Sequence, residues 1–380
     1  MQRNAASTIM RFDTMKRGCV VILIIILILS LLGCNKTGAM PDELNITGDP
    51  VALGAYSPMG DNYAPGDRND NGAAGDSAIK VVCTIFPTYD WTRRIIGDLA
   101  DGFDVTLLLG GRADLHSYQP TVDDIVKITT CDLFIYVGGE SDKWVEGVLR
   151  QTLNPDIVIL KLLDILGGTA KIEEDPEGYE GGDSGGRGGE SGGDDHNLGV
   201  EDDYDEHVWL SLRNAAMFCR GIADVLSALD VENAEIYDEN LAGYAGELAL
   251  LDNAYSIATA AAPANVLLFC SRFPFRYMMD DYNIEYYAAF PGCSAETEAS
   301  FGTVIFLAEK IDELALKYVL ETESDDQSLA NVVINSSTTK NQKILKLDSM
   351  QSVSISDIQN GTTFLSIMES NLEVLKEALS

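Results

Sequence analysis

Short apolar runs alternate with amphipathic segments over most of the chain from residue 79 onward. The apolar runs predict strands, and the segments in which apolar residues recur every three or four positions predict helices. The strands expected first are Ile79–Phe86, Asp104–Leu109, Asp132–Val137 and Ile157–Leu160, and the helices between them are Asp90–Leu99, Asp123–Lys127 and Trp144–Thr152. Continuous apolar strands separated by helices are typical of a parallel sheet covered on both faces, and thus of an α/β fold.

A second series of the same kind follows two longer helical segments. Leu212–Leu229 has a helical pattern, and Asn233–Ala261 is rich in Ala and Leu and predicts one helix about 40 Å long. The strands expected next are Asn265–Phe269, Ile284–Ala289, Tyr318–Glu321 and Lys343–Leu347, with helices at Phe273–Tyr282, Phe301–Leu314, Gln327–Ile334 and Thr363–Leu379. The sequence therefore predicts two Rossmann-like lobes, residues 79–230 and 263–380, joined by one connecting helix within residues 231–262.

Two stretches lack this periodicity. Residues 34–78 are rich in Gly, Asp, Asn and Pro, which predicts a flexible tether. Residues 167–206 combine Gly pairs with acidic side chains. No core is expected from that composition, so we interpret these residues as an acidic insertion in the first lobe.

The first residues do not have the pattern of a globular domain. A basic pair, Lys16-Arg17, precedes the apolar run Val20–Leu32, which is shorter than the roughly 20 residues that a membrane-spanning helix needs. The run ends in Leu-Leu-Gly-Cys, which resembles a bacterial lipobox. We therefore expect residues 1–33 to be a signal peptide and Cys34 to be acylated, with a retained apolar anchor as the alternative. Either interpretation places the rest of the chain on the extracytoplasmic face of the cell membrane.

The formal net charge of -34 argues against binding to nucleic acid by electrostatic attraction and favours cations as partners. The cysteines after Cys34 are Cys83, Cys131, Cys219, Cys270 and Cys293. They show no CxxC pairing, which excludes a zinc finger. Two disulfides, Cys270 with Cys293 and Cys83 with Cys131, are compatible with the sequence, because each of these cysteines lies in or beside an expected strand.

The chain has three histidines, His116, His196 and His207. His116 follows an expected strand and a Gly-Gly turn, and parallel sheets place ligand-binding groups after the carboxyl ends of their strands. His207 lies where the acidic insertion meets the next helix. Neutral imidazole is a common zinc ligand, and a zinc site takes about four N, S or O ligands. The alternative for each histidine is a loop residue with structural hydrogen bonds only.

Two motifs resemble those of a known family, the zinc and manganese solute-binding lipoproteins of ABC importers. Residues 113–121, Ala-Asp-Leu-His-Ser-Tyr-Gln-Pro-Thr, resemble the family's first ligand motif, and residues 205–211, Asp-Glu-His-Val-Trp-Leu-Ser, resemble its second. With the blocks that follow, the resemblance spans residues 79–380. It implies a periplasmic-binding-protein-like fold with a metal cleft between the lobes, and it implies that His116 and His207 are ligands.

The remaining ligands depart from the family's pattern. The family's third ligand, a His or Glu before an aromatic motif, falls at Arg272, whose guanidinium has no lone pair for a cation. Its last ligand matches Asp348, for which a turn or N-cap aspartate is the alternative. The predicted site comprises His116, His207 and Asp348, completed by water, Ser271, Glu321 or His196.

Two further segments have counterparts in the family. The acidic insertion stands where zinc-type members carry a long His-rich loop, and its expected role is to raise the local concentration of cations. A solvated insertion without function is the alternative. The block Gly292–Glu298 resembles a family loop at the lobe interface, for which we expect a structural role.

These features predict a monomeric, lipid-anchored receptor that captures a divalent metal ion and passes it to the permease of an ABC importer, which has a separate ATPase subunit. Zinc is expected rather than manganese, because two imidazoles suit zinc and manganese favours more carboxylates. We expect no enzyme activity, because the HExxH and GxxxxGK[ST] motifs do not occur. A surface adhesin of the same fold without transport function is the alternative.

Overall fold

The structure is a computed structural model of the chain, and it describes residues 78–111, 115–180, 204–294 and 298–380. All of these residues belong to one unit, which spans Asp70–Ser380. The expected signal peptide, the acylated Cys34, the tether up to residue 77 and His196 lie outside the described residues. None of the described helices combines the length and the apolar character that crossing a membrane requires.

Four parallel strands form the first sheet, in the order β2-β1-β3-β4. They are β1 (Ile79–Cys83), β2 (Phe103–Leu107), β3 (Leu133–Tyr136) and β4 (Val158–Lys161). Successive side chains of β1 point to opposite faces of the sheet. Val81 therefore shares a core with helix α2 (Phe86–Ile96), whereas Val82 shares another with α3 (Val122–Thr130) and α4 (Trp144–Leu149). Burial of both faces explains why these strands are continuously apolar.

The second sheet is also parallel, in the order β6-β5-β7-β8. Its strands are β5 (Val266–Phe273), β6 (Glu285–Pro291), β7 (Tyr318–Thr322) and β8 (Lys343–Leu347). The helices in this part of the chain are α8 (Arg276–Asp281), α9 (Phe301–Glu313), α10 (Ser328–Ser336), α11 (Ile355–Gln359) and α12 (Phe364–Ala378). The prediction of two parallel-sheet α/β lobes is confirmed.

The predicted start of one helix is wrong. We expected a helix from Phe273, but β5 continues to that residue and α8 begins at Arg276. Pro274 explains the difference, because a proline disfavours the helical conformation of the residue before it and has no N–H of its own to donate. Strand β5 thus reaches further toward the carboxyl edge of its sheet than the pattern suggests.

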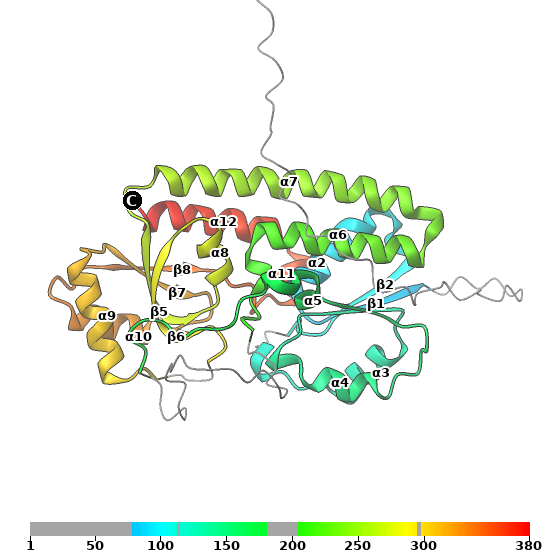
Figure 1. Cartoon of the computed structure of the whole chain (residues 1–380), viewed down its shortest axis with the longest axis horizontal. Helices are drawn as coiled ribbons and strands as arrows, with labels where there is room; N and C mark the ends of the chain where they lie inside the picture. Colours follow the sequence, from blue (N-terminus) through cyan, green and yellow to red (C-terminus); the bar gives the residue numbers. More distant parts are fainter. Residues whose placement is uncertain (1–77, 112–114, 181–203, 295–297) are drawn as a thin grey trace, which may run out of the picture. The chain divides into compact units, whose positions relative to one another are not determined.

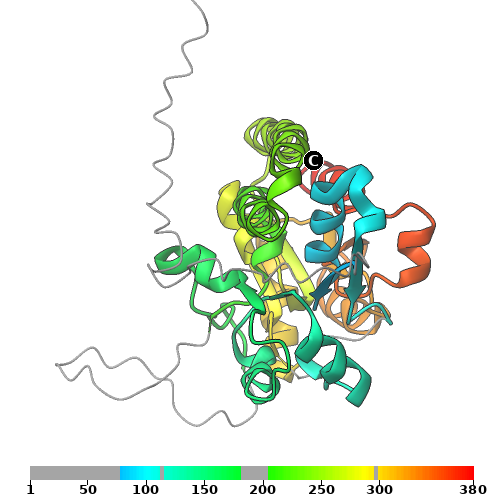
Figure 2. The same ribbon diagram turned by 90° about the vertical axis from the view of Figure 1, so that its right-hand side faces the viewer.

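One long helix, α7 (Ala234–Ala261), follows α6 (Leu212–Leu229), and Figure 1 shows α6 and α12 running alongside it. Figure 2 looks along these helices and shows α12 beside α7. The buried residues of α7 recur every three or four positions, so they form one stripe along the helix. Tyr237 in this stripe contacts Phe103 of the first sheet, and the hydroxyl of Tyr255 donates to the carbonyl of Met368 in α12 at 2.5 Å. The connecting helix therefore packs against both lobes.

Residues 171–180 of the acidic insertion pack against the second lobe. Glu174 pairs with Arg276 at 3.0 Å, and the ring of Tyr179 meets that of Phe290 edge-on at 6.4 Å. The expectation that the insertion forms no packed structure is therefore wrong for residues 171–180. The composition of the whole insertion did not predict this packing, because the many glycines in residues 181–193 dominate its average and the 171–180 segment has few apolar side chains.

All five described cysteines are free thiols, so neither of the two disulfides that the sequence allows is present among them. Burial raises the pKa of Cys83 and of Cys131 to about 12, which keeps both thiols protonated at neutral pH. Cys219 and Cys270 are buried as well, whereas Cys293 is only half-buried.

Candidate metal centre

His207 is fully buried and comes directly before the short 3-10 helix η5 (Val208–Leu210). Oδ1 of Asp205 accepts a hydrogen bond from the backbone N–H of His207 at 2.9 Å and lies 2.9 Å from its Nδ1. A carboxylate only accepts, so Nδ1 is the donor, and in neutral imidazole Nε2 then carries the lone pair. Burial lowers the pKa of His207, but Asp205 and Glu206 outweigh burial and raise it above its usual value.

His116 is oriented by a second set of acceptors. It lies in the short helix η2 (Leu115–Ser117), and its Nδ1 is 2.8 Å from Oγ of Ser141 and 3.5 Å from Oε2 of Glu206. Glu206 also accepts from the backbone N–H of Ser141 at 2.7 Å, so serine and glutamate hold one another in place. With Nδ1 fixed in this way, Nε2 of His116 points toward His207.

The carboxylate of Glu206 fits beside Gly139 because this glycine has no side chain. Gly139 adopts a φ of 87°, and a Cβ on it would lie 2.4 Å from Oε1 of Glu206. Glu206 is completely buried, and its Oε2 has no hydrogen-bond partner among the described residues. A buried carboxylate oxygen that accepts no hydrogen bond is costly, and a positive charge nearby lowers that cost.

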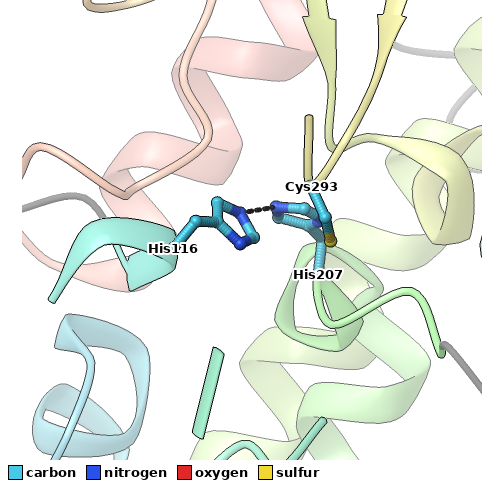
Figure 3. Close-up of side chains that lie close together, drawn as sticks. All are labelled: His116, His207 and Cys293. Carbon is cyan, nitrogen blue, oxygen red and sulfur yellow. Dashed lines mark hydrogen bonds between the residues drawn. The ribbon is translucent and has the colours of Figure 1, made fainter. Parts of the chain in front are cut away.

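The two imidazoles present their remaining nitrogens to each other, as Figure 3 shows. Nε2 of His116 lies 3.2 Å from Nε2 of His207. Two nitrogens that each bind a tetrahedral zinc ion at about 2.05 Å are about 3.3 Å apart. The spacing of this pair is therefore that of two ligands on one zinc ion, and both nitrogens are already oriented by hydrogen bonds on the opposite side of each ring.

A third donor comes from the second lobe. The sulfur of Cys293 and one imidazole nitrogen each of His116 and His207 all lie within 4.8 Å of one another. Burial raises the pKa of the Cys293 thiol, and Glu173 and Glu206 raise it further. The sequence did not point to Cys293 as a ligand, because the cysteines show no CxxC pairing and a structural role was expected for the block Gly292–Glu298 that contains it. The available signal was its position a few residues after the expected strand Ile284–Ala289, because His116 was singled out by a similar position after a strand.

Asp348 has a different role in this structure. Its Oδ1 accepts from the backbone N–H of Met350 at 2.7 Å, so it forms the turn that follows β8. Burial raises the pKa of Asp348 to about 6, and Glu323 adds to this shift. Its carboxylate does not belong to the group formed by the two histidines and Cys293. Coordination by Asp348 stays a prediction that requires its loop to move.

The other predicted donors lie apart from this group or are engaged elsewhere. Glu321 is buried beside Asp325. Burial raises the pKa of its carboxyl group to about 7, and the charge of Asp325 adds to the shift, so the group is largely protonated below that pH. The hydroxyl of Ser271 donates to the carbonyl of Arg272 at 2.9 Å. Glu321 does not belong to the group formed by the two histidines and Cys293, and the hydroxyl of Ser271 is engaged with the backbone.

Arg272 lies at the end of β5, where the resemblance places a metal ligand. It lines a cavity of about 230 Å³ on the second lobe together with Pro274, Thr322, Ser324, Ser349, Gln351 and Ser352. The guanidinium has no lone pair, so this position contributes no metal ligand.

Two parallel-sheet lobes that share one long helix, with imidazoles of one lobe facing a thiol of the other, define a two-lobed solute-binding protein with a metal site. A sequence profile of one such family, the zinc-uptake complex component A periplasmic proteins (ZnuA), matches residues 81–378. The chain belongs to this family, which is a family of metal-binding transport receptors.

Curated relatives agree with this assignment. The zinc-binding lipoprotein AdcA of Streptococcus pneumoniae is 28% identical over 314 residues, which cover 81% of this chain and 57% of AdcA. The chain thus spans a little over half the length of that relative. The high-affinity zinc uptake system protein ZnuA of Bacillus subtilis is 26% identical over 322 residues, covering 83% of this chain and 93% of that protein.

Solved structures share the fold. The Zn(II)-bound ZnuA-like domain of Streptococcus pneumoniae AdcA superimposes with a TM-score of 0.61 at 25% identity and covers 80% of this chain and 99% of that domain. A laminin-binding protein of Streptococcus agalactiae, a bifunctional adhesin and metal transporter, gives a TM-score of 0.62 at 20% identity over 80% of this chain and 100% of its own. The latter likeness concerns the fold alone.

Proposed function

We propose that this chain captures zinc outside the cell membrane and delivers it to an ABC importer. The observation that carries the proposal is the pair of Nε2 atoms of His116 and His207, which are 3.2 Å apart. Each ring is fixed through its other nitrogen, by Asp205 in one case and by Ser141 with Glu206 in the other. Carboxylate-supported imidazoles are the usual form in which histidine is presented to a metal.

The fourth position of the site is a second part of the proposal. Asp348 takes it when the lobes close further, or water does; Ser271, Glu321 and His196 are the remaining alternatives. The indole N–H of Trp209 donates to the carbonyl of Ser349 at 3.0 Å, so the loop that carries Asp348 already contacts the segment after His207. A small movement of this loop brings a carboxylate toward the imidazoles.

The location and the partners of the protein follow from the same proposal. Acylation of Cys34 anchors the chain to the extracytoplasmic face of the cell membrane, and residues 34–78 tether the lobes to it. A permease receives the ion, and the importer's ATPase subunit supplies the energy, so the chain acts as a monomeric receptor and not as an enzyme. The acidic insertion raises the concentration of cations near the site.

The test is zinc binding by the purified, metal-depleted chain, measured by calorimetry and by metal analysis. We expect one tightly bound zinc per chain. His116→Ala and His207→Ala are each expected to abolish tight binding, because each removes one of the closely spaced nitrogens. His196→Ala is the matched comparison, and we expect it to retain zinc, as does a variant that lacks residues 182–202.

Uptake of radioactive zinc by cells that carry the importer completes the test, and it is expected to fall in the same two variants. The proposal would be contradicted if the chain bound several ions only weakly, if this binding were lost on removal of residues 182–202, and if it were unchanged in His116→Ala. That outcome would reduce the protein to a surface lipoprotein that shares the fold.

A further inference from the structure

Cys293 is held in a defined turn at the carboxyl edge of the second sheet. Strand β6 ends at Pro291, and the backbone N–H of Ser294 donates to the carbonyl of Pro291 at 3.3 Å. The backbone N–H of Cys293 donates to Oε1 of Glu173, in the 171–180 segment, at 2.7 Å. Both lobes therefore fix this turn, and Figure 3 shows the sulfur beside the ring of His207.

The residue before the cysteine permits this close approach. A Cβ on Gly292 would lie 2.9 Å from Cε1 of His207 and 2.9 Å from the carbonyl oxygen of Phe273. Real Cβ atoms do not come so near to a backbone oxygen, so a larger side chain would push the turn away from the imidazole. Glycine at this position thus lets the thiol reach the histidines.

The distances suit a single metal ion after a small adjustment. The sulfur and the two imidazole nitrogens lie within 4.8 Å of one another. A sulfur at about 2.3 Å and a nitrogen at about 2.05 Å from tetrahedral zinc are about 3.6 Å apart. Movement of the turn by roughly 1 Å is enough to bring the sulfur to that separation.

The charge around the group also favours a cation. Oε2 of Glu206 is fully buried, lacks a hydrogen-bond partner among the described residues and lies 3.5 Å from Nδ1 of His116. Asp205 contacts the other imidazole. A zinc ion with one thiolate ligand has a net charge of about +1, which these buried carboxylates stabilise across the two rings.

We infer that Cys293 is the third protein ligand of the metal, bound as a thiolate, and that it replaces the ligand which the family pattern places at Arg272. This inference rests on the proposed zinc capture. When zinc binds, the S–H bond breaks, the proton leaves to solvent and a sulfur–zinc bond forms. The site then has two nitrogen ligands and one sulfur ligand, with the fourth position open to water or Asp348.

A sulfur ligand determines which ions the receptor takes. Thiolates are soft donors that suit zinc, whereas manganese is bound by carboxylates, carbonyls and water. The His116, His207 and Cys293 set therefore selects zinc over manganese more strongly than histidines and carboxylates alone. Replacing the sulfur by oxygen in Cys293→Ser is expected to reduce this selectivity.

X-ray absorption at the zinc edge tests the inference on the unmodified full chain. We expect one sulfur at about 2.3 Å and nitrogens at about 2.0–2.1 Å. A shell of nitrogen and oxygen only would overturn the inference and leave zinc capture intact. A chain that retains no zinc at all would overturn the proposed function and this inference together.

Variants provide an independent readout. Cobalt bound to the unmodified chain is expected to show a near-ultraviolet charge-transfer band from the thiolate, and the band should be missing in Cys293→Ala and Cys293→Ser. Zinc affinity is expected to fall at least tenfold in both variants. Cys270→Ala, a second free cysteine of the same lobe, is the control, and it should keep the band. Persistence of the band in Cys293→Ala would rule out this ligand.

Discussion

At the scale of single residues, Asp205 controls how His207 is presented. One of its oxygens accepts from both the backbone and the ring of this histidine. The carboxylate thereby selects the imidazole tautomer with a lone pair on Nε2 and increases its basicity. This contact is local in the chain, because the two residues are separated only by Glu206.

We predict that Asp205→Asn weakens zinc binding by about 10–100-fold, the usual effect of removing the partner of a metal-binding histidine. The amide keeps a similar shape but loses the charge and no longer selects one tautomer. Calorimetric titration with zinc measures the change. Asp98→Asn, an exposed site in the first lobe, is the matched control. Equal affinity in both variants would show that the carboxylate does not support the imidazole.

At the scale of secondary-structure elements, α7 connects the two cores through one face only. Its buried residues are Tyr237, Leu241, Tyr244, Leu248, Leu251 and Tyr255. The other face is exposed, including Leu250 at 74%. The helix therefore stabilises the protein by packing, and its few glycines lie where the neighbouring space is open: a Cβ on Gly243 or Gly246 would meet nothing within 4 Å.

Leu248→Ala is expected to lower the free energy of unfolding by about 2–5 kcal/mol, because it leaves a cavity in the core beneath the helix. Leu250→Ala changes an exposed leucine on the same helix and is expected to shift it by less than about 0.5 kcal/mol. Urea denaturation followed by circular dichroism compares the two. Similar losses in both would mean that α7 does not pack on the lobes through this stripe.

At the scale of the whole molecule, the chain carries a formal net charge of -34 and yet buries several carboxyl groups. Burial raises the pKa of Asp142 to about 7. The hydrogen bond that Asp142 accepts from the backbone N–H of Gly138 opposes this shift, and the negative charge of Glu206 adds to it. At a pH between 3.8, the ordinary pKa of this group, and about 7, Asp142 keeps a proton in the folded chain that it has lost in the unfolded chain. The stabilisation from this group is complete below pH 3.8 and is lost as the pH rises to about 7.

Asp142→Asn is therefore expected to reduce the fall in melting temperature between about pH 5 and pH 8. Asp142 accepts a hydrogen bond from the backbone N–H of Gly138 at 2.8 Å, and the oxygen of an asparagine can accept the same bond. The asparagine amide does not ionise. Thermal unfolding of metal-free protein at both pH values measures this difference. Asp101→Asn, at an exposed site, should behave like the unmodified chain. An unchanged pH dependence in Asp142→Asn would contradict the raised pKa.

The sequence by itself determined those features that depend on neighbours in the chain. Continuous apolar runs gave the parallel strands, because both faces of each sheet are covered. The apolar period of three to four residues gave α7, and the Gly-Gly turn before His116 marked a position after a strand. Asp205 and His207 lie within one short motif, so their hydrogen bond follows from local geometry.

Tertiary structure alone decided which donors meet. Cys293 reaches the histidines because β6 ends opposite them and Gly292 leaves room for the turn. Asp348 is engaged in its own turn instead. The 171–180 segment packs on the far lobe, which its composition concealed. For Cys293 and for the 171–180 segment the partner is distant in the chain, and the packing of the two lobes, which no local pattern records, brings them together.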